Sequence, residues 1–418
     1  MMAEDGLRPP GGAAPDEWCL HHFDHLSAEL AQVMPDTMAR MRRLCPVARS
    51  EEHGGFWVVS CYDAALAVAQ DWPTYSSAHG LSITANPGLI RNLPVEADPP
   101  EQYIYKRLVS PFFTPSAVAR LEARTRDLVD GLIDRLIGDE TEGSATEGRA
   151  EFMDAFARPM PSRAFFELAI NAPAGHLDRV SYLASRSSTP QDPRARECWL
   201  GLHQWVRDFV SQRREQPQRG DVVDALIRAD VGGRPITEEE IVGTVQLLIL
   251  GGLETTAGAL GLAMVRLCRD RELQQALRAS PDLIPGAVEE SLRIDPSFVC
   301  VGRTAVRDAE LAGQAIAAGD KILIHWASAN RDPGEFPDPD RFDPGRQRNR
   351  HLAFGAGPHR CVGSSLARMN MRIALAELLR RLEDIRLDDS CPEQAIRYHA
   401  GLTRSPLSVP IRFTPASR

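Results

Sequence analysis

A long apolar segment in the second half of the chain limits what this protein can fold into. The segment, IVGTVQLLILGGLETTAGALGLAMV, covers residues 241–265 and is long enough to cross a bilayer, for which roughly 20 apolar residues suffice. It carries Glu254 near its middle, together with Gln246 and several threonines. A charge at mid-bilayer costs at least about 2.5–3.5 kcal/mol. The sequence therefore favours a buried core helix over a membrane span.

Two adjacent glycines lie in the interior of this expected helix. Gly251 and Gly252 each cost a helix about 1 kcal/mol relative to alanine, and Glu254 and Thr255 follow shortly after them. One interpretation is a close helix crossing with Glu254 facing the surface. The other is a helix surface that makes room for a flat ligand, to which Thr255 and Glu254 relay protons. The helix alone leaves both interpretations open.

A glycine-rich loop with a single cysteine, HLAFGAGPHRCVGSSLARM, covers residues 351–369. It is not a dinucleotide-binding loop, because Arg360 stands where the third glycine belongs and a polar loop precedes it. Cys361 comes just before an amphipathic helix, whose N-terminus stabilises a thiolate. Gly355 and Gly363 would let the loop lie flat against a planar cofactor and bring amide N–H groups to the sulfur. The alternative is one more buried structural cysteine.

Charge and cysteine content exclude several classes of protein. A net charge of −9 argues against nucleic-acid binding, which needs an excess of Lys and Arg. The eight cysteines are scattered without C-x-x-C pairs, which indicates reduced thiols in a cytosolic protein. Residues 1–18 are acidic, rich in Pro and Gly, and lack the apolar core of a signal peptide or anchor. We expect them to form a flexible segment.

A cluster of possible metal ligands, CLHHFDH, lies near the N-terminus. Its members are Cys19, His21, His22, Asp24 and His25. They are too tightly bunched for a tetrahedral zinc site, and no second ligand pair lies at zinc-finger spacing. A capped loop is therefore the favoured interpretation.

Helical periodicity dominates the rest of the chain, and Thr237 with Glu240 forms a capping-box pattern before the central helix. No internal repeat or dividing linker is found. The sequence predicts a mainly α fold with a small β portion, in which residues 1–418 form one domain. The strand-like segments are residues 54–63, 309–326 and 401–413.

Together these segments resemble the cytochrome P450 haem-thiolate monooxygenases. The loop FGAGPHRCVG is similar to that family's F-G-x-G-x-H-x-C-x-G haem-binding loop at every specified position. GGLETT at residues 251–256 resembles the oxygen-activation motif, and ESLR at residues 290–293 resembles the E-x-x-R motif. The resemblance covers nearly the whole chain. It implies the cytochrome P450 fold, with haem b held between the long central helix and the cysteine loop.

The resemblance also implies roles for individual residues. Cys361 would be the axial iron ligand, and Thr255 and Glu254 would be catalytic, holding oxygen and relaying protons. The residues expected to contact the haem or its propionates are Cys361, Phe354, Gly355, His359, Gly363, Arg303, Gln102, Lys106 and Gly251. A structural ion network is expected from Glu290, Arg293 and Arg341. The expected substrate-lining residues are Leu81, Leu89, Leu247, Leu250, Phe298, Val299 and Leu402.

One pair of residues departs from the family pattern. Many soluble members have His and Arg where this chain has Gln102 and Lys106. Both side chains can still donate to a propionate, although lysine lacks the bidentate fork of arginine.

The implied function is hydroxylation of a neutral hydrophobic molecule by O2 in a cytoplasmic monomer. Electrons would come from an acidic ferredoxin and its NAD(P)H-dependent reductase. A peroxide-driven oxidase and a non-catalytic haem-thiolate sensor are the alternatives, and the pair of Glu254 and Thr255 argues against both. The basic residues expected to dock the ferredoxin are Lys106, Arg107, Arg348, Arg350, Arg360 and Arg372.

Overall fold

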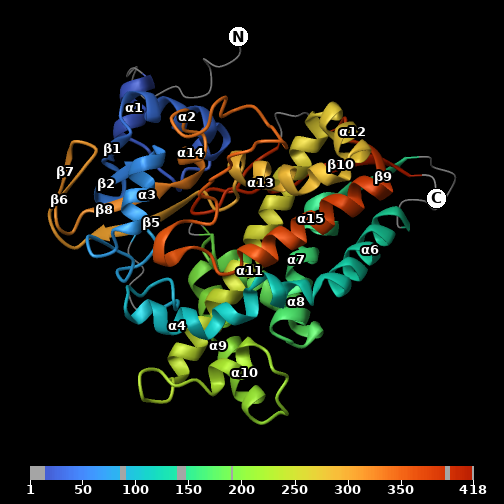
Figure 1. Ribbon diagram of the computed structural model, residues 1–418, viewed down its shortest axis with the longest axis horizontal. Helices are drawn as coiled ribbons and strands as arrows, with labels where there is room; N and C mark the ends of the chain where they lie inside the picture. The colour runs from blue at the N-terminus through green and yellow to red at the C-terminus, as the bar shows by residue number, and fades with distance from the viewer. Residues whose placement is uncertain (1–14, 85–90, 139–146, 190–191, 391–395, 417–418) are drawn as a thin grey trace.

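Most of the chain is helical in the computed structural model, which describes residues 15–84, 91–138, 147–189, 192–390 and 396–416 (Figure 1). Short 3-10 or π turns, η2 to η8, link several of the helices. The α-helices are α1 (Pro15–His21), α2 (Leu30–Leu44), α3 (Tyr62–Gln70), α4 (Glu101–Val109), α5 (Pro115–Ala119), α6 (Glu122–Gly138), α7 (Pro159–Arg163), α8 (Leu177–Ser187), α9 (Ala195–Arg214), α10 (Val222–Ile227), α11 (Glu238–Arg269), α12 (Arg271–Ala279), α13 (Ile284–Ile294), α14 (Trp326–Ala329) and α15 (Ser364–Arg381).

The strands form three small sheets, of which the largest has the order β1-β2-β8-β5-β3. In it, β2 pairs with β8 in parallel, and the other pairs are antiparallel. A second sheet has the order β4-β10-β9, and β6 pairs with β7. The strands are β1 (Val47–Ser50), β2 (Phe56–Val59), β3 (Tyr75–Ser76), β4 (Gly148–Glu151), β5 (Cys300–Ala305), β6 (Ala309–Leu311), β7 (Gln314–Ile316), β8 (Lys321–His325), β9 (Leu382–Leu387) and β10 (Pro410–Pro415).

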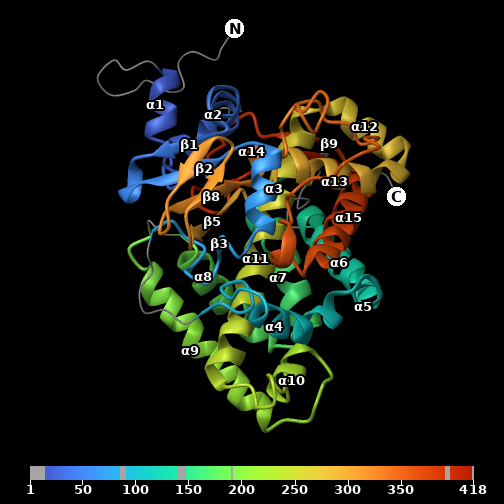
Figure 2. The same ribbon diagram turned by 60° about the vertical axis from the view of Figure 1, so that its left-hand side comes forward.

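The five-stranded sheet and the helices lie side by side. Figure 2 shows this sheet flanked by α2 and α3, with α4, α9 and α10 at the opposite end of the protein. Apolar side chains form one large core among the helices and two smaller cores against the sheet and under α2. The protein is therefore a mainly helical body with a small β portion, as the sequence predicts.

The central helix α11 runs without a break through the helical body (Figure 1). Its N-terminus carries the expected capping box: Thr237 accepts the backbone N–H of Glu240, and the Glu240 carboxylate accepts the backbone N–H of Thr237. Among the residues described, it is the one helix long and apolar enough to cross a membrane. However, 72% of its most apolar window is buried inside the protein. This burial is what a core helix requires.

Some predictions of individual strands and helices are confirmed, and others are not. The three strand-like segments contain β2, the run β6-β7-β8, and part of β10, but β1, β3, β4, β5 and β9 lie outside them. Residues 117–137, in which apolar side chains recur at helical spacing, are divided between α5 and α6. The flexible segment predicted over residues 1–18 falls mostly outside the described residues, and α1 already begins at Pro15.

Candidate active site

The cysteine loop folds back on itself so that its two ends meet. The backbone N–H of Cys361 donates to the carbonyl of Phe354 at 2.8 Å, and that of Gly355 donates to Leu352 at 2.9 Å. Gly355 and Gly357 adopt φ angles of +66° and +64°, which side chains other than glycine rarely accept. A Cβ atom on Gly357 would also lie 2.4 Å from the backbone oxygen of Ala69 in α3. The glycines therefore serve the turn and its close approach to α3.

The Cys361 thiol lies two residues before Gly363, at the N-terminus of α15. Of the cysteines within the described ranges, Cys361 alone is exposed. Surrounding protein atoms nevertheless displace much of the nearby water. That burial raises the pKa of the thiol, while a hydrogen bond from the Gly363 amide and the charges of Lys106, Arg360 and Arg368 act in the opposite direction. Cys361 is thus accessible to a ligand, and the groups near its sulfur stabilise a thiolate. Both properties suit a metal ligand.

The ring of Phe354, within this loop, is held in place by a cation–π contact with Arg368. The guanidinium of Arg368 lies 4.5 Å from the centre of the Phe354 ring. Arg368 in turn donates two hydrogen bonds to Glu289 in α13, at 2.6 and 2.8 Å. His351 also contacts Glu289, at 3.1 Å. This chain of contacts fixes the ring that the sequence places next to the sulfur.

Gln102 and Lys106, which are expected to contact the haem propionates, donate hydrogen bonds to the backbone of the cysteine loop. Gln102 donates from Nε2 to the carbonyl of Pro358 at 2.8 Å. Lys106 donates to the same carbonyl and, at 3.0 Å, to that of Arg360. The two side chains lie four residues apart on one face of α4, and the tight turn directs the loop carbonyls toward that face. They therefore anchor the cysteine loop.

Arg303 and His359 carry buried polar atoms without an acidic hydrogen-bond partner among the described residues. Arg303 is 4% exposed, and among the described residues it donates only to the adjacent carbonyl of Gly302. Burial lowers its pKa to about 10, against the attraction of Asp98. His359 contacts Ser77 at 3.1 Å through Nε2, whereas no residue in the described part of the chain forms a hydrogen bond with its buried Nδ1.

These unpaired donors are the test of whether a haem fits. Buried polar groups are normally paired, and a buried guanidinium without a carboxylate is costly. The charge of Arg303 acts on His359, so the two groups lie near each other. A ligand that brings carboxylates to this place would satisfy both. Haem b carries two propionates, and the residues present fit it.

The surface of α11 around Gly251 is open, as the second interpretation of its glycines requires. Gly251 is exposed although its helix is mostly buried, and a Cβ atom there would meet no atom within 4 Å. Gly252 differs, because a Cβ atom there would lie 2.9 Å from the Phe165 ring. Thr255 donates to the carbonyl of Gly251 at 2.8 Å, so its hydroxyl lies along the same face. Gly251 therefore leaves open space beside the helix, and Gly252 allows the Phe165 ring to pack closely against it.

Glu254 is held away from bulk water. Burial raises its pKa, and the charge of Arg158 and a hydrogen bond with Ser185 oppose the rise only in part. A carboxyl group with a raised pKa keeps a proton more readily near neutral pH. No sequence motif indicated Arg158, which directly precedes α7, or Ser185, which lies in α8.

The comparisons with known proteins agree with this geometry. The family model for cytochrome P450 matches residues 166–409. The chain belongs to the cytochrome P450 family. It is 35% identical over 388 residues to cytochrome P450 monooxygenase PikC of Streptomyces venezuelae, covering 90% of each chain. It is 31% identical to a steroid C26-monooxygenase of Mycobacterium tuberculosis, covering 90% of this chain and 99% of the relative.

A solved structure has the same fold. The crystal structure of CYP108D1 from Novosphingobium aromaticivorans superposes with a TM-score of 0.84 at 29% identity, covering 97% of this chain and 99% of that one. Members of this family are monooxygenases that carry haem b on a cysteine thiolate. The expected family, fold, enzyme class and cofactor are therefore confirmed.

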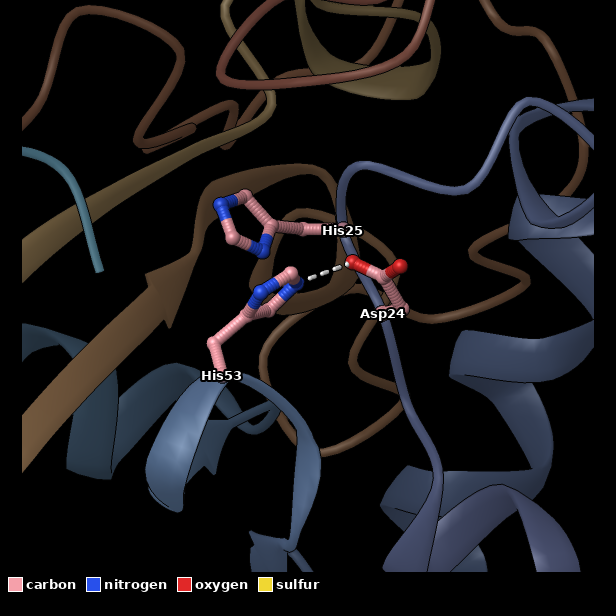
Figure 3. A group of neighbouring side chains, drawn as sticks. All are labelled: Asp24, His25 and His53. Atoms are coloured by element: carbon pink, nitrogen blue, oxygen red, sulfur yellow. Dashed lines mark hydrogen bonds and ion pairs between the residues drawn. The ribbon is translucent and has the colours of Figure 1, made fainter. Parts of the chain in front are cut away.

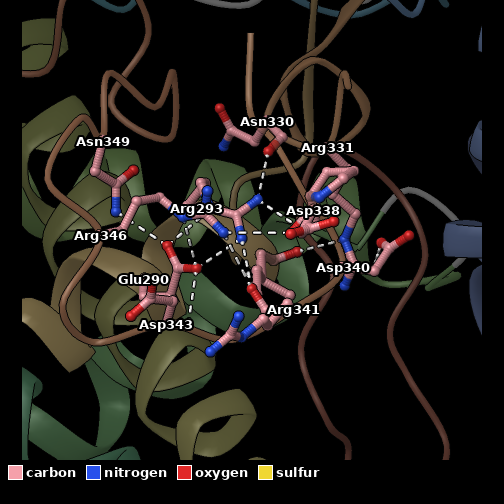
Figure 4. Close-up of polar contacts among 12 residues, drawn as sticks. Glu290, Arg293, Asn330, Arg331, Asp338, Asp340, Arg341, Asp343, Arg346 and Asn349 are labelled. Carbon is pink, nitrogen blue, oxygen red and sulfur yellow. Dashed lines mark hydrogen bonds and ion pairs between the residues drawn. The ribbon is translucent and has the colours of Figure 1, made fainter. Parts of the chain in front are cut away.

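The ion network of this P450 contains a different arginine from the one expected (Figure 4). Glu290 and Arg293 are both fully buried and share two hydrogen bonds, at 2.7 and 2.8 Å. The second guanidinium on Glu290 belongs to Arg346, with Nε 3.0 Å from Oε1. Arg341 contributes only its backbone carbonyl, which accepts from Arg293 and Arg346, and its side chain is exposed. The loop turns its backbone inward at this point, so the prediction for Arg341 was wrong.

The expected substrate-lining residues divide between two environments. Leu81, Leu247, Leu250 and Phe298 are half-buried, as residues beside an open space should be. Val299 is 2% exposed and packs in the apolar core under α2, so its assignment is corrected. Consecutive residues of extended chain face opposite sides, which prevents Phe298 and Val299 from lining one pocket. Leu402 is half-buried but packs against the same core as Val299, and Leu89 lies outside the described residues.

Proposed function

We propose that this P450 hydroxylates a small to medium, neutral, hydrophobic molecule, inserting one oxygen atom of O2 into a C–H bond. The observation that carries the proposal is the open face at Gly251, next to the Thr255 hydroxyl and the half-buried Glu254. A carboxyl group and a hydroxyl on consecutive residues are suited to moving protons inward. The half-buried apolar side chains of Leu81, Leu247 and Leu250 favour a ligand held by burial.

Each polar group then has a defined task. Bound haem b, ligated by the Cys361 thiolate, supplies the iron that activates O2. Arg303 and His359 hold the propionates, and Lys106 and Gln102 keep the loop in place. Glu254 takes up protons from the side of Ser185, and Thr255 passes them to the open face by releasing the carbonyl of Gly251.

Electrons are proposed to come from an acidic ferredoxin with an NAD(P)H-dependent reductase. Support comes from a shallow hollow of about 540 Å³ beside the cysteine loop, lined by residues that include Trp72, Tyr103 and Lys106. Arg107 and Arg360 are exposed near it, and neither has a carboxylate within ion-pairing distance in the described part of the chain. The other expected residues are already paired: Arg348 and Arg350 with Glu335, and Arg372 with Glu122.

The proposal includes a monomeric, cytoplasmic enzyme, in accord with the reduced cysteines and the burial of α11. A peroxide-driven oxidase and a haem-thiolate sensor are the competing functions. Neither function requires the delivery of protons to O2. Neither therefore explains why a carboxyl group and a hydroxyl group occur together at Glu254 and Thr255.

Thr255→Ala tests the proposal. The variant should keep its haem and its substrate-induced spectral change, because among the described residues the Thr255 hydroxyl bonds only to the carbonyl of Gly251 in its own helix. It should release most reducing equivalents as hydrogen peroxide instead of product, measured by NAD(P)H consumed against product and peroxide formed. Thr256→Ala, on a buried face of the same helix, is the control and should stay coupled. Unchanged coupling in Thr255→Ala, or no reductant-dependent product in either protein, would refute the monooxygenase proposal.

A further inference from the structure

Three metal-ligating side chains meet near the N-terminus, away from the haem site (Figure 3). Asp24 and His25 lie in the loop between α1 and α2, and His53 lies in the turn η2 (Glu52–Gly54) between β1 and β2. One ligand atom from each lies within 4.8 Å of the other two. We propose that these three residues bind one divalent transition-metal ion of the zinc class.

His25 is the residue that points to a missing ligand. Its side chain is 1% exposed, and neither ring nitrogen has a hydrogen-bond partner among the described residues. Its ring lies edge-on to Phe56 at 5.8 Å and to His53 at 5.7 Å. Apolar packing accounts for the position of the ring but leaves both nitrogens unsatisfied, which is uncommon for buried polar atoms. A metal ion bound to one nitrogen removes half of this deficit.

Asp24 and His53 already face each other. Nε2 of His53 lies 2.7 Å from Oδ1 of Asp24, and both side chains are partly exposed, at 24% and 29%. An ion can therefore reach them from solvent. Ligand atoms around a tetrahedral zinc ion are about 3.3 Å apart for bonds of about 2.0–2.1 Å. Binding thus requires this pair to open slightly and the His25 ring to turn inward.

The two segments are held together by other bonds, so their ligands are positioned before an ion arrives. The backbone N–H of Glu51 donates to the carbonyl of His21 at 2.8 Å, and Ser50 donates to that of Phe23 at 2.8 Å. His22 contacts Glu52 at 3.2 Å. The contact between these two segments changes the interpretation of the sequence CLHHFDH. Asp24 and His25 belong to it, and the third ligand, His53, comes from a turn farther along the chain.

The chemistry of the donors selects the ion. Two imidazoles and one carboxylate suit Zn²⁺, Ni²⁺ or Co²⁺, with water completing the coordination, whereas Ca²⁺ and Mg²⁺ prefer oxygen ligands alone. Such an ion would link the loop after α1 to the turn between β1 and β2. Its expected effect is to stabilise the N-terminal part of the protein without changing the haem site.

The test uses the haem-loaded protein. Protein treated with EDTA, incubated with Zn²⁺ and desalted should retain one more zinc per iron, by elemental analysis, than the variant His53→Ala. Zinc should raise the melting temperature of the wild type by about 2–4 °C and leave His53→Ala unchanged. His21→Ala, which removes an exposed histidine outside the cluster, should behave as the wild type.

Asp24→Asn gives a second, nearly isosteric measurement and should weaken zinc binding at least about tenfold by the loss of one anionic ligand. Equal zinc content in wild type and His53→Ala would overturn the proposal. An equal thermal shift with Ca²⁺ in place of Zn²⁺ would overturn the assignment of the ion class.

Discussion

The Nε atom of Arg346 lies 3.0 Å from Oε1 of Glu290, on a carboxylate that has no exposed surface. Burial alone would raise the pKa of Glu290, but the hydrogen bonds from Arg293 and Arg346 outweigh it and hold the pKa below its usual value. The backbone N–H of Asp343 and the amide of Asn349 complete the set of donors to this carboxylate. The loop before the cysteine is thus fixed to α13 through one buried charge.

Replacing Arg346 should therefore destabilise the protein far more than replacing Arg341. Arg346→Ala removes a charged hydrogen bond to a buried carboxylate and should cost about 1.5–3 kcal/mol of unfolding free energy. Arg341→Ala removes an exposed side chain whose useful atom is its backbone carbonyl, and should change the free energy by less than about 0.5 kcal/mol. Urea unfolding of the two variants measures the difference, and equal values would contradict this account of the network.

The two adjacent glycines of α11 should respond to alanine in opposite directions. Gly251→Ala fills open space and gains helix propensity, so haem-free protein should be more stable by up to about 1 kcal/mol. Gly252→Ala puts a methyl group against the Phe165 ring at 2.9 Å and should lower stability by about 1–3 kcal/mol. Thermal unfolding without haem tests both signs. A stabilised Gly252→Ala would mean that Phe165 can move aside.

Glu289 predicts part of the pH dependence of stability. Burial raises its pKa, but hydrogen bonds from His351 and Arg368 outweigh this and lower the pKa from 4.5 to about 2. Because the folded pKa lies below the unfolded one, the contribution of Glu289 is complete above about pH 4.5. It is lost as the pH falls toward 2.

The corresponding measurement compares unfolding free energies at pH 7, 5, 4 and 3. The wild type should lose more stability than Glu289→Gln as the pH falls, so that the two curves converge. Glu272→Gln, an exposed residue on α12, should run parallel to the wild type. Curves for Glu289→Gln that also stay parallel would show that Glu289 is not linked to folding.

Charge reversal should locate the docking face for the electron donor. Arg107→Glu with Arg360→Glu should lower ferredoxin-driven turnover at least about tenfold at low salt, and added salt should narrow the gap, since surface charges are screened. Reduction by dithionite should be unaffected. Arg271→Glu on α12, remote from α4, is the control (Figure 1). Ferredoxin-driven turnover that is unchanged in the double variant at low salt would exclude this face.

The sequence was sufficient for features that depend on local pattern. The buried central helix, its capping box and the glycines of the cysteine loop follow from the chemistry of neighbouring residues, and the structure confirms them. The family resemblance supplied the order of the motifs. Short strands such as β4 and β9 were missed because their pairing is with distant segments and leaves little alternation in the sequence.

The errors concern side chains whose direction is set by loop paths. Arg341 and Arg346 lie in the same loop, and only the turn of its backbone decides which guanidinium reaches Glu290. Phe298 and Val299 are adjacent in the sequence, but they pack against different apolar cores. The contact of His359 with Ser77 joins residues 282 positions apart and has no signature in the sequence.

The bond from Lys106 to the carbonyl of Arg360 joins positions 254 residues apart. During synthesis, α4 and α11 leave the ribosome well before the cysteine loop that they serve. The site is therefore incomplete until the last part of the chain has been synthesised. Contacts between residues so far apart in the sequence also form slowly. The complete haem site can therefore form only once this C-terminal part of the chain is present. A protein truncated before Phe354 would lack Cys361 and with it the thiolate that holds the iron.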